Sequence, residues 1–329
     1  MSIHDLPSEN LIKKKPPLSK VLVVVGPTAS GKTTTAIELA KRLNGEIISA
    51  DSRQIYKHLD IGTAKPTTEQ LASAKHYFVD ELLPDQDFSA GEFGERGREI
   101  INCILSKNKT PIVVGGSGLY VQSLIDGFFE GPGADKEFRE MLERRVATGE
   151  LPHMIEELRT VDPLSAMKID PTKPRRIIRA LEVFHITGKP LSQHHQESRI
   201  QINFRPIQFG LDWERKILYD RINRRCEEMI NAGLLNEVEH LEELGYTPQQ
   251  GHALNALNTV GYAEAFAYRS GSVSYEEMMR LFKQNSRRYA KRQLTWFRKD
   301  KRIHWLTLHE GSVIGDTTNA ITEKWMSIR

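Results

Sequence analysis

The chain has little of what marks a secreted, membrane-spanning or disulfide-stapled protein. Only two of its 329 residues are cysteine, Cys103 and Cys226, and neither belongs to a Cys-x-x-Cys pair. This argues against a disulfide framework and a cysteine-rich zinc site, and it favours a reducing, cytoplasmic compartment. No run of about 18 apolar residues occurs, so we expect no contact with a membrane. Residues 1–19 lack the apolar middle of a secretory signal and are expected to form a polar tail.

The chain also lacks a strong charge of one sign. Its 46 Lys and Arg residues face 43 acidic residues, for a net charge of +3, so any nucleic-acid surface must be local. One basic cluster is KPRRIIR at 173–179, and a second at 287–302 holds eight Lys or Arg with Tyr289, Trp296 and Phe297 between them. We expect the cations to contact nucleic acid and the aromatic rings to pack in the core. A solvated amphipathic helix is the alternative.

A phosphate-binding loop is the clearest motif. The segment GPTASGKT follows the apolar run 21–25 and precedes a helical pattern, the context in which such a loop cradles a pyrophosphate with its backbone N–H groups. Lys32 is expected to contact the outer phosphate oxygens, and the Thr33 hydroxyl to hold Mg²⁺. The whole loop is expected to bind the diphosphate or nucleotide: Gly26, Pro27, Thr28, Ala29, Ser30, Gly31, Lys32 and Thr33.

Short apolar runs predict a parallel α/β sheet. The runs at 21–25, 46–50, 111–114 and 206–211 are separated by helical patterns and are largely apolar, as in strands covered on both faces. The first three end in polar segments, which should meet in one crevice at the carboxyl edge of the sheet. Between 130 and 205 the sequence changes to charged helical segments and predicts an inserted helical domain.

The core domain is therefore expected to comprise residues 20–129 and 206–329. Two long helical patterns, at 214–244 and 275–299, lie in its second part, and Ser274 with Glu277 forms a possible capping box for the second of them.

Several side chains are candidates for chemistry near the loop. Asp51 follows the second apolar run and is our candidate general base; capping of a following helix is the alternative. Asp80, at the end of YFVDE, is the rival metal ligand, although a structural role is favoured. Arg221 and Arg225 lie at i and i+4, and could clamp an anion from outside the loop.

Five segments together resemble the tRNA dimethylallyltransferase family. They are GPTASGKT, DSRQIYKHLDIGTAKP at 51–66, VGGSGLYVQSLIDG at 114–127, RRIIRALEVFHITGKP at 175–190 and KRQLTWFRKD at 291–300. The resemblance implies a P-loop NTPase-like core whose helical insertion grips the tRNA anticodon stem-loop. It implies transfer of a dimethylallyl group from dimethylallyl diphosphate to the exocyclic N6 amine of the adenosine 3′ of the anticodon, at position 37. Catalysis would then involve Asp51, Lys32, Thr33, Arg225 and Arg221, with Mg²⁺ as cofactor.

The resemblance also implies which residues line the RNA path. In this sequence they are Asp51, Ser52, Arg53, Gln54, Ser117, Arg139, Arg175, Arg176, Ile177, Ile178, Arg179, Asn258, Thr259, Val260, Gly261, Tyr262, Ala263, Lys291, Arg292, Gln293, Leu294, Thr295, Trp296, Phe297 and Arg298.

Two other functions stay open at this point. An ATP-dependent small-molecule kinase would use Lys32 and magnesium on a transferable phosphoryl group, with Asp80 completing the metal site. An RNA-binding protein could use the nucleotide as a switch, which leaves Asp51 without a role. The expected partners are tRNA and dimethylallyl diphosphate, and the expected assembly is a monomer.

Overall fold

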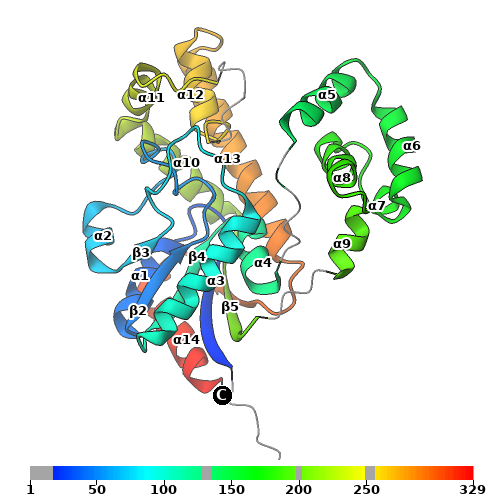
Figure 1. Ribbon diagram of the computed structural model, residues 1–329. Coiled ribbons are helices and arrows are strands. Elements are labelled where there is room, and N and C mark those ends of the chain that lie inside the picture. Colours follow the sequence, from blue (N-terminus) through cyan, green and yellow to red (C-terminus); the bar gives the residue numbers. More distant parts are fainter. Residues whose placement is uncertain (1–17, 128–132, 134, 198–201, 249–255, 329) are drawn as a thin grey trace, which may run out of the picture.

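The core of the molecule is a six-stranded parallel sheet (Figure 1). The computed structural model describes residues 18–127, 133, 135–197, 202–248 and 256–328. The strand order is β3-β2-β4-β1-β5-β6. The strands are β1 Ser19–Val25, β2 Gly45–Ser49, β3 His76–Tyr77, β4 Thr110–Gly115, β5 Phe204–Trp213 and β6 His304–Leu308.

The central strands β1 and β4 are largely apolar because helices cover both faces of the sheet. Along β1, Val21, Val23 and Val25 point into one core cluster, and Leu22 and Val24 point into another. The second cluster is closed by two helices, α1 Lys32–Arg42 and α14 Ile314–Ser327. Six other helices cover the first: α3 Ala90–Ser106, α4 Gly118–Asp126, α10 Arg215–Asn231, α11 Leu234–Glu243, α12 Tyr262–Arg269 and α13 Tyr275–Phe297. The short helix α2 Thr68–Ser73 contacts α1.

The strand register brings the three polar segments together. Val25 at the end of β1 pairs with Gly115, and Ser49 at the end of β2 pairs with Val114. The phosphate loop, Asp51 and the turn at 115–118 therefore leave the same edge of the sheet. This confirms the predicted α/β core and the shared crevice.

Five helices between the two halves of the core form a lobe of their own, to one side of the sheet in Figure 1. They are α5 Lys136–Ala147, α6 Leu151–Val161, α7 Pro163–Lys168, α8 Pro174–Thr187 and α9 Leu191–Glu197. Leu142, Met154, Leu158 and Ile177 belong to its separate hydrophobic cluster. The domain boundaries at 130 and 205 stay a prediction.

One predicted element needs correction, and one strand was not predicted. The predicted helix at 214–244 is two helices, because Gly233 adopts a left-handed φ of 101° between α10 and α11. Strand β6 was not anticipated. The predicted helix at 275–299 is confirmed as α13, where the Ser274 side chain accepts a hydrogen bond of 3.2 Å from the Glu277 backbone. Most of the predicted tail lies outside the described residues, and among the described helices none has the length and apolar character to cross a bilayer.

Candidate active site

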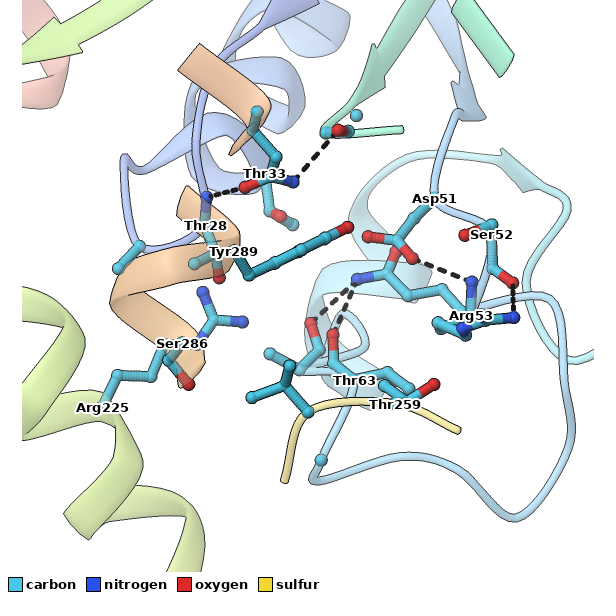
Figure 2. A pocket seen from close by; sticks show the side chains of 18 of the residues that line it. Thr28, Thr33, Asp51, Ser52, Arg53, Thr63, Arg225, Thr259, Ser286 and Tyr289 are labelled. Atoms are coloured by element: carbon cyan, nitrogen blue, oxygen red, sulfur yellow. Dashed lines mark hydrogen bonds between the residues drawn. The ribbon is translucent and has the colours of Figure 1, made fainter. Parts of the chain in front are cut away.

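A cavity of about 280 Å³ opens at the carboxyl edge of the sheet, between the phosphate loop, α10 and α13 (Figure 2). The loop contributes Thr28, Ala29, Lys32 and Thr33, and the segment after β2 contributes Asp51 to Gln54. The segments 62–66, 114–116 and 258–260 close the remaining sides. The cavity therefore joins a phosphate cradle to a carboxylate in one enclosed space.

The cradle forms because the loop reverses directly into a helix. Gly31 is left-handed, with φ 91°, and α1 begins at Lys32. The first N–H groups of a helix have no partner within it, and with the positive end of the helix dipole they bind anions. The Ser30 hydroxyl oxygen is buried and makes no hydrogen bond among the described residues, so a polar ligand could satisfy it.

The Lys32 ammonium group is held above this cradle. Its Nζ donates a 2.6 Å hydrogen bond to the carbonyl oxygen of Pro27. Burial, followed by the positive charge of Arg225, lowers the pKa of Lys32 to about 7, and the negative charge of Asp51 partly opposes this. An anion bound in the cradle would favour the protonated form. Binding of an anion would therefore shift Lys32 from its neutral form to its protonated form.

The two arginines of α10 have different positions. Arg225 points into the cavity (Figure 2), and burial lowers its pKa while Asp51 opposes the shift; a guanidinium stays charged all the same. Arg221 instead braces the loop from outside, since its Nε donates a 2.9 Å hydrogen bond to the Ala29 carbonyl oxygen. Its guanidinium lies 4.3 Å from the centre of the Trp213 ring.

Asp51 lies on the opposite side of the cavity from Arg225. One of its carboxylate oxygens accepts a 2.9 Å hydrogen bond from the Arg53 backbone N–H, within a series of turns. No helix follows it directly, so the helix-capping alternative is wrong. Figure 2 shows its carboxylate turned towards the phenol of Tyr289. Burial, and next the charge of Asp51, raise the pKa of Tyr289 to about 12, so this phenol is a neutral hydrogen-bonding group.

The turn after β4 fixes the segment that follows Asp51. The Ser117 hydroxyl accepts a 3.0 Å hydrogen bond from the Ser52 backbone N–H. Gln54 donates to the carbonyl oxygens of Thr63 and Ala64, at 3.3 and 3.1 Å, and so holds the loop that lines the far wall. The side chains of Ser117 and Gln54 therefore fix the shape of the cavity by hydrogen bonding to the backbone of its walls.

The wall between α10 and α13 is largely apolar, and sequence reasoning missed it. Its lining residues are Ile222, Cys226 and Met229 on α10 and Phe282, Ser286 and Tyr289 on α13. Their spacing of three and four places each set on one face of its helix, and this periodicity was the available signal. A space with charged groups at one end and an apolar wall at the other suits an amphiphilic ligand.

The residues expected to contact RNA fall into three groups. The half-buried group is Asp51, Ser52, Arg53, Gln54, Ser117, Arg139, Arg179, Thr259, Val260 and Leu294. Arg175, Arg176, Asn258, Ala263, Lys291, Arg292, Thr295 and Arg298 have exposed side chains, and Trp296 is 37% exposed. By contrast, Ile177, Ile178, Tyr262 and Phe297 are buried and do not line the cavity, so a direct side-chain contact with RNA is wrong for these four. Their burial in helix packing makes them supports for the surface. Gln293 is buried too, but it lines the cavity. Gly261 is also buried and is left-handed where α12 begins.

Asp80 does not belong to the cavity. It is paired with Lys65, and its backbone N–H donates a 3.1 Å hydrogen bond to the Gln54 carbonyl oxygen. The structural role favoured for it therefore agrees with its surroundings, and the kinase alternative loses its second metal ligand.

Comparison with known proteins places this architecture in one family. The family model described as IPP transferase matches residues 54–300. The tRNA dimethylallyltransferase of Acetivibrio thermocellus is 46% identical over 297 residues, which cover 89% of this chain and 93% of that protein. The enzyme of the same name from Cytophaga hutchinsonii is 45% identical over 299 residues, covering 91% and 95%.

Solved structures agree with this. The tRNA isopentenylpyrophosphate transferase of Bacillus halodurans superposes with a TM-score of 0.67 at 38% identity, covering 93% of this chain and 96% of that one. A eukaryotic dimethylallyltransferase captured acting on tRNA gives a TM-score of 0.80 at 26% identity, covering 94% and 80%. The chain belongs to the tRNA dimethylallyltransferase family, whose P-loop NTPase-like core it shares.

Proposed function

We propose that this protein transfers the dimethylallyl group of dimethylallyl diphosphate to the exocyclic N6 amine of adenosine 37, next to the tRNA anticodon. The observation that carries this proposal is the single cavity in which a phosphate cradle, an apolar wall and the Asp51 carboxylate meet. In a diphosphate with a short branched hydrocarbon tail, the diphosphate fits the cradle and the tail fits the apolar wall. The relatives' names supply the tRNA acceptor.

The cradle binds the donor by its diphosphate. The N–H groups at the start of α1, the Lys32 ammonium and the Arg225 guanidinium surround the position of the anion. When the bond between the allylic carbon and the diphosphate oxygen breaks, negative charge grows on the leaving group. Prearranged donors in a closed site stabilise that charge most when it is largest.

Asp51 receives the proton that the amine loses. The lone pair of an adenine amine is delocalised into the ring, so the amine is a weak nucleophile and benefits from an oriented base. As the new bond between N6 and the allylic carbon forms, one amine proton moves to the Asp51 carboxylate and diphosphate departs. Tyr289, facing Asp51, is placed to orient the base or the substrate.

The residues present fit a magnesium ion that is held mainly by the ligand. The Thr33 hydroxyl lines the cavity, and no cluster of three or more His, Cys, Asp or Glu side chains exists among the described residues. Mg²⁺ commonly takes one or two protein oxygens and completes its shell with phosphate oxygens and water. It would supply charge neutralisation of the leaving diphosphate.

The acceptor reaches the cavity only after leaving its stack. A base in the anticodon loop stacks on its neighbouring bases, and extruding it costs a few kcal/mol. The exposed cations of α8 and α13 supply the phosphate contacts that offset this cost. The protein acts as a monomer in the cytoplasm, a reducing compartment that fits its two unpaired cysteines.

A transfer assay with altered acceptors tests the proposal. We expect label from dimethylallyl diphosphate to enter an anticodon stem-loop that carries adenosine at position 37. The same RNA with inosine there lacks the amine and should stay unlabelled. Asp51→Asn should lower the transfer rate by about 100-fold or more and leave RNA affinity within about threefold. Full transfer by Asp51→Asn would remove Asp51 as the base, and labelling of the inosine RNA would refute the amine as acceptor.

A further inference from the structure

The side chain of Gln293 bridges two loops of the active site. It lies on α13 within the basic block, but it is only 6% exposed. Its Oε1 accepts a 2.8 Å hydrogen bond from the backbone N–H of Thr28 in the phosphate loop. Its Nε2 donates a 3.0 Å hydrogen bond to the carbonyl oxygen of Gly116, after β4. Figure 2 marks the bond at Thr28.

The turn after β4 has room for two side chains of α13 only because Gly116 and Gly118 lack side chains. A Cβ added to Gly116 would lie 2.2 Å from Nε2 of Gln293, and one added to Gly118 would lie 2.2 Å from the Trp296 ring. Contacts this short do not occur, so the turn at 115–118 is shaped to receive α13. The two observations, hydrogen bonding and close approach, point to the same fit.

We propose that Gln293 is a positioning residue for the diphosphate cradle and makes no contact with RNA. It lines the cavity beside the phosphate loop, and both ends of its amide are already bonded to backbone groups of the two loops. It fixes the entry of the phosphate loop, and thereby the direction of the N–H groups from Ala29 to Thr33. This inference rests on the proposed function for the identity of the ligand, a diphosphate.

The same helix separates the two roles by its faces. Lys291, Arg292 and Thr295 are exposed, whereas Gln293 and Phe297 are buried. Residues four apart lie on the same face of a helix, so the inward face carries the bridge and the outward face carries the cations. Replacing a residue on the inward face should change the affinity for pyrophosphate, and replacing one on the outward face should change the affinity for RNA.

Binding measurements on matched variants test this assignment. Gln293→Met keeps the length of the side chain and removes both hydrogen bonds, leaving a buried donor and a buried acceptor unpaired. We expect it to weaken the binding of inorganic pyrophosphate, measured by calorimetry, by about tenfold. Its Kd for an anticodon stem-loop RNA should stay within about twofold. Lys291→Gln, on the outward face, should show the reverse pattern.

Two further variants keep the inference testable if Gln293→Met does not fold. Gln293→Glu retains an acceptor for Thr28 but loses the donor to Gly116, and Gly116→Ala displaces the amide directly; each should raise the KM for the donor more than the Kd for RNA. Weaker RNA binding by Gln293→Met with unchanged pyrophosphate affinity would overturn the inference, and so would no change in either. Pyrophosphate binding needs no transfer, so failure of prenylation by the wild type would refute the proposed function alone.

Discussion

Lys32 has a charge state that depends on whether an anion is bound. Its ammonium is close to Arg225 and removed from bulk water, and both effects favour the neutral amine. A diphosphate in the cradle reverses this balance, because the negative charge of the ligand stabilises the ammonium form. The ligand therefore binds together with a proton whenever the solution pH is above the pKa of Lys32 in the ligand-free protein.

Proton uptake at pH 8 measures this effect. With a pKa of about 7, Lys32 is mostly neutral at pH 8 and mostly protonated at pH 6. We expect pyrophosphate binding at pH 8 to take up about one proton more in the wild type than in Lys32→Met, and this difference to shrink at pH 6. Calorimetry in two buffers with different ionisation enthalpies gives the number. Equal uptake by both proteins at pH 8 would show that Lys32 is already charged.

At the same scale, the sequence predicted the residues that act through a contiguous motif. GPTASGKT specifies its own backbone shape, so Lys32 and Thr33 could be placed from this segment and its neighbours alone. Gln293 could not, because its partners at 28 and 116 are distant along the chain. Arg221 was expected at the anion, but its contact with Ala29 depends on how α10 approaches the loop.

Among the elements, α5 and α8 are joined by a buried carboxylate. Glu182 on α8 is fully buried and accepts hydrogen bonds of 3.1 and 2.8 Å from Arg139 on α5, and one of 2.8 Å from Arg179. A buried carboxylate with two guanidinium partners orients both of them. We infer that Glu182 holds the basic surface of the lobe in the shape that RNA meets.

Glu182→Gln should therefore affect both the lobe and RNA binding. The amide is the same size but lacks the charge, and we expect a loss of about 1 to 3 kcal/mol of unfolding free energy, a modest value because both arginines are 34–40% exposed. RNA affinity should fall several-fold while pyrophosphate affinity is unchanged. Glu143→Gln, an exposed change of the same charge on α5, is the control. Unchanged RNA affinity in Glu182→Gln would limit Glu182 to a packing role.

The elements that could be predicted are those whose own residues determine them. Strands β1, β2, β4 and β5 each contain a largely apolar run, and all four were anticipated. Strand β6 was missed because it lies at the edge of the sheet and is only partly buried, which weakens its hydrophobic pattern. The break at Gly233 was missed because a glycine within a helical pattern is tolerated at modest cost.

In the whole molecule, positive charge is concentrated on particular surfaces. The net charge of +3 gives no general attraction for RNA, so affinity must come from local contacts such as those of α13. Each phosphate contact releases counterions and adds to the salt dependence of binding. Whole-molecule electrostatics can therefore be tested one cation at a time.

Salt titrations of RNA binding should distinguish the two sides of the sheet. Lys291→Gln, on the outward face of α13, should reduce the slope of log K against log salt by roughly 0.7 to 0.9. Lys324→Gln removes the same charge from α14, which covers the opposite face of the sheet, and should leave the slope unchanged. Equal slopes for wild type and Lys291→Gln would place the RNA elsewhere.

The cavity itself was beyond prediction from sequence. Its crevice edge followed from the ends of the strands, but its apolar wall depends on how α10 and α13 are packed over the sheet. Such long-range packing leaves only a weak periodic signal in each helix. The exposed face and the buried face of α13 likewise became distinct only in three dimensions.

A labelled transfer reaction distinguishes prenyl transfer from phosphoryl transfer. The purified wild-type protein is incubated with Mg²⁺, labelled dimethylallyl diphosphate and an anticodon stem-loop bearing adenosine 37, with ATP consumption followed in a parallel reaction. We expect label in the RNA, located on the N6 amine of that adenosine by mass spectrometry, without any need for ATP. Unlabelled RNA together with consumed ATP would contradict prenyl transfer. It would indicate instead that the phosphate loop binds ATP for phosphoryl transfer.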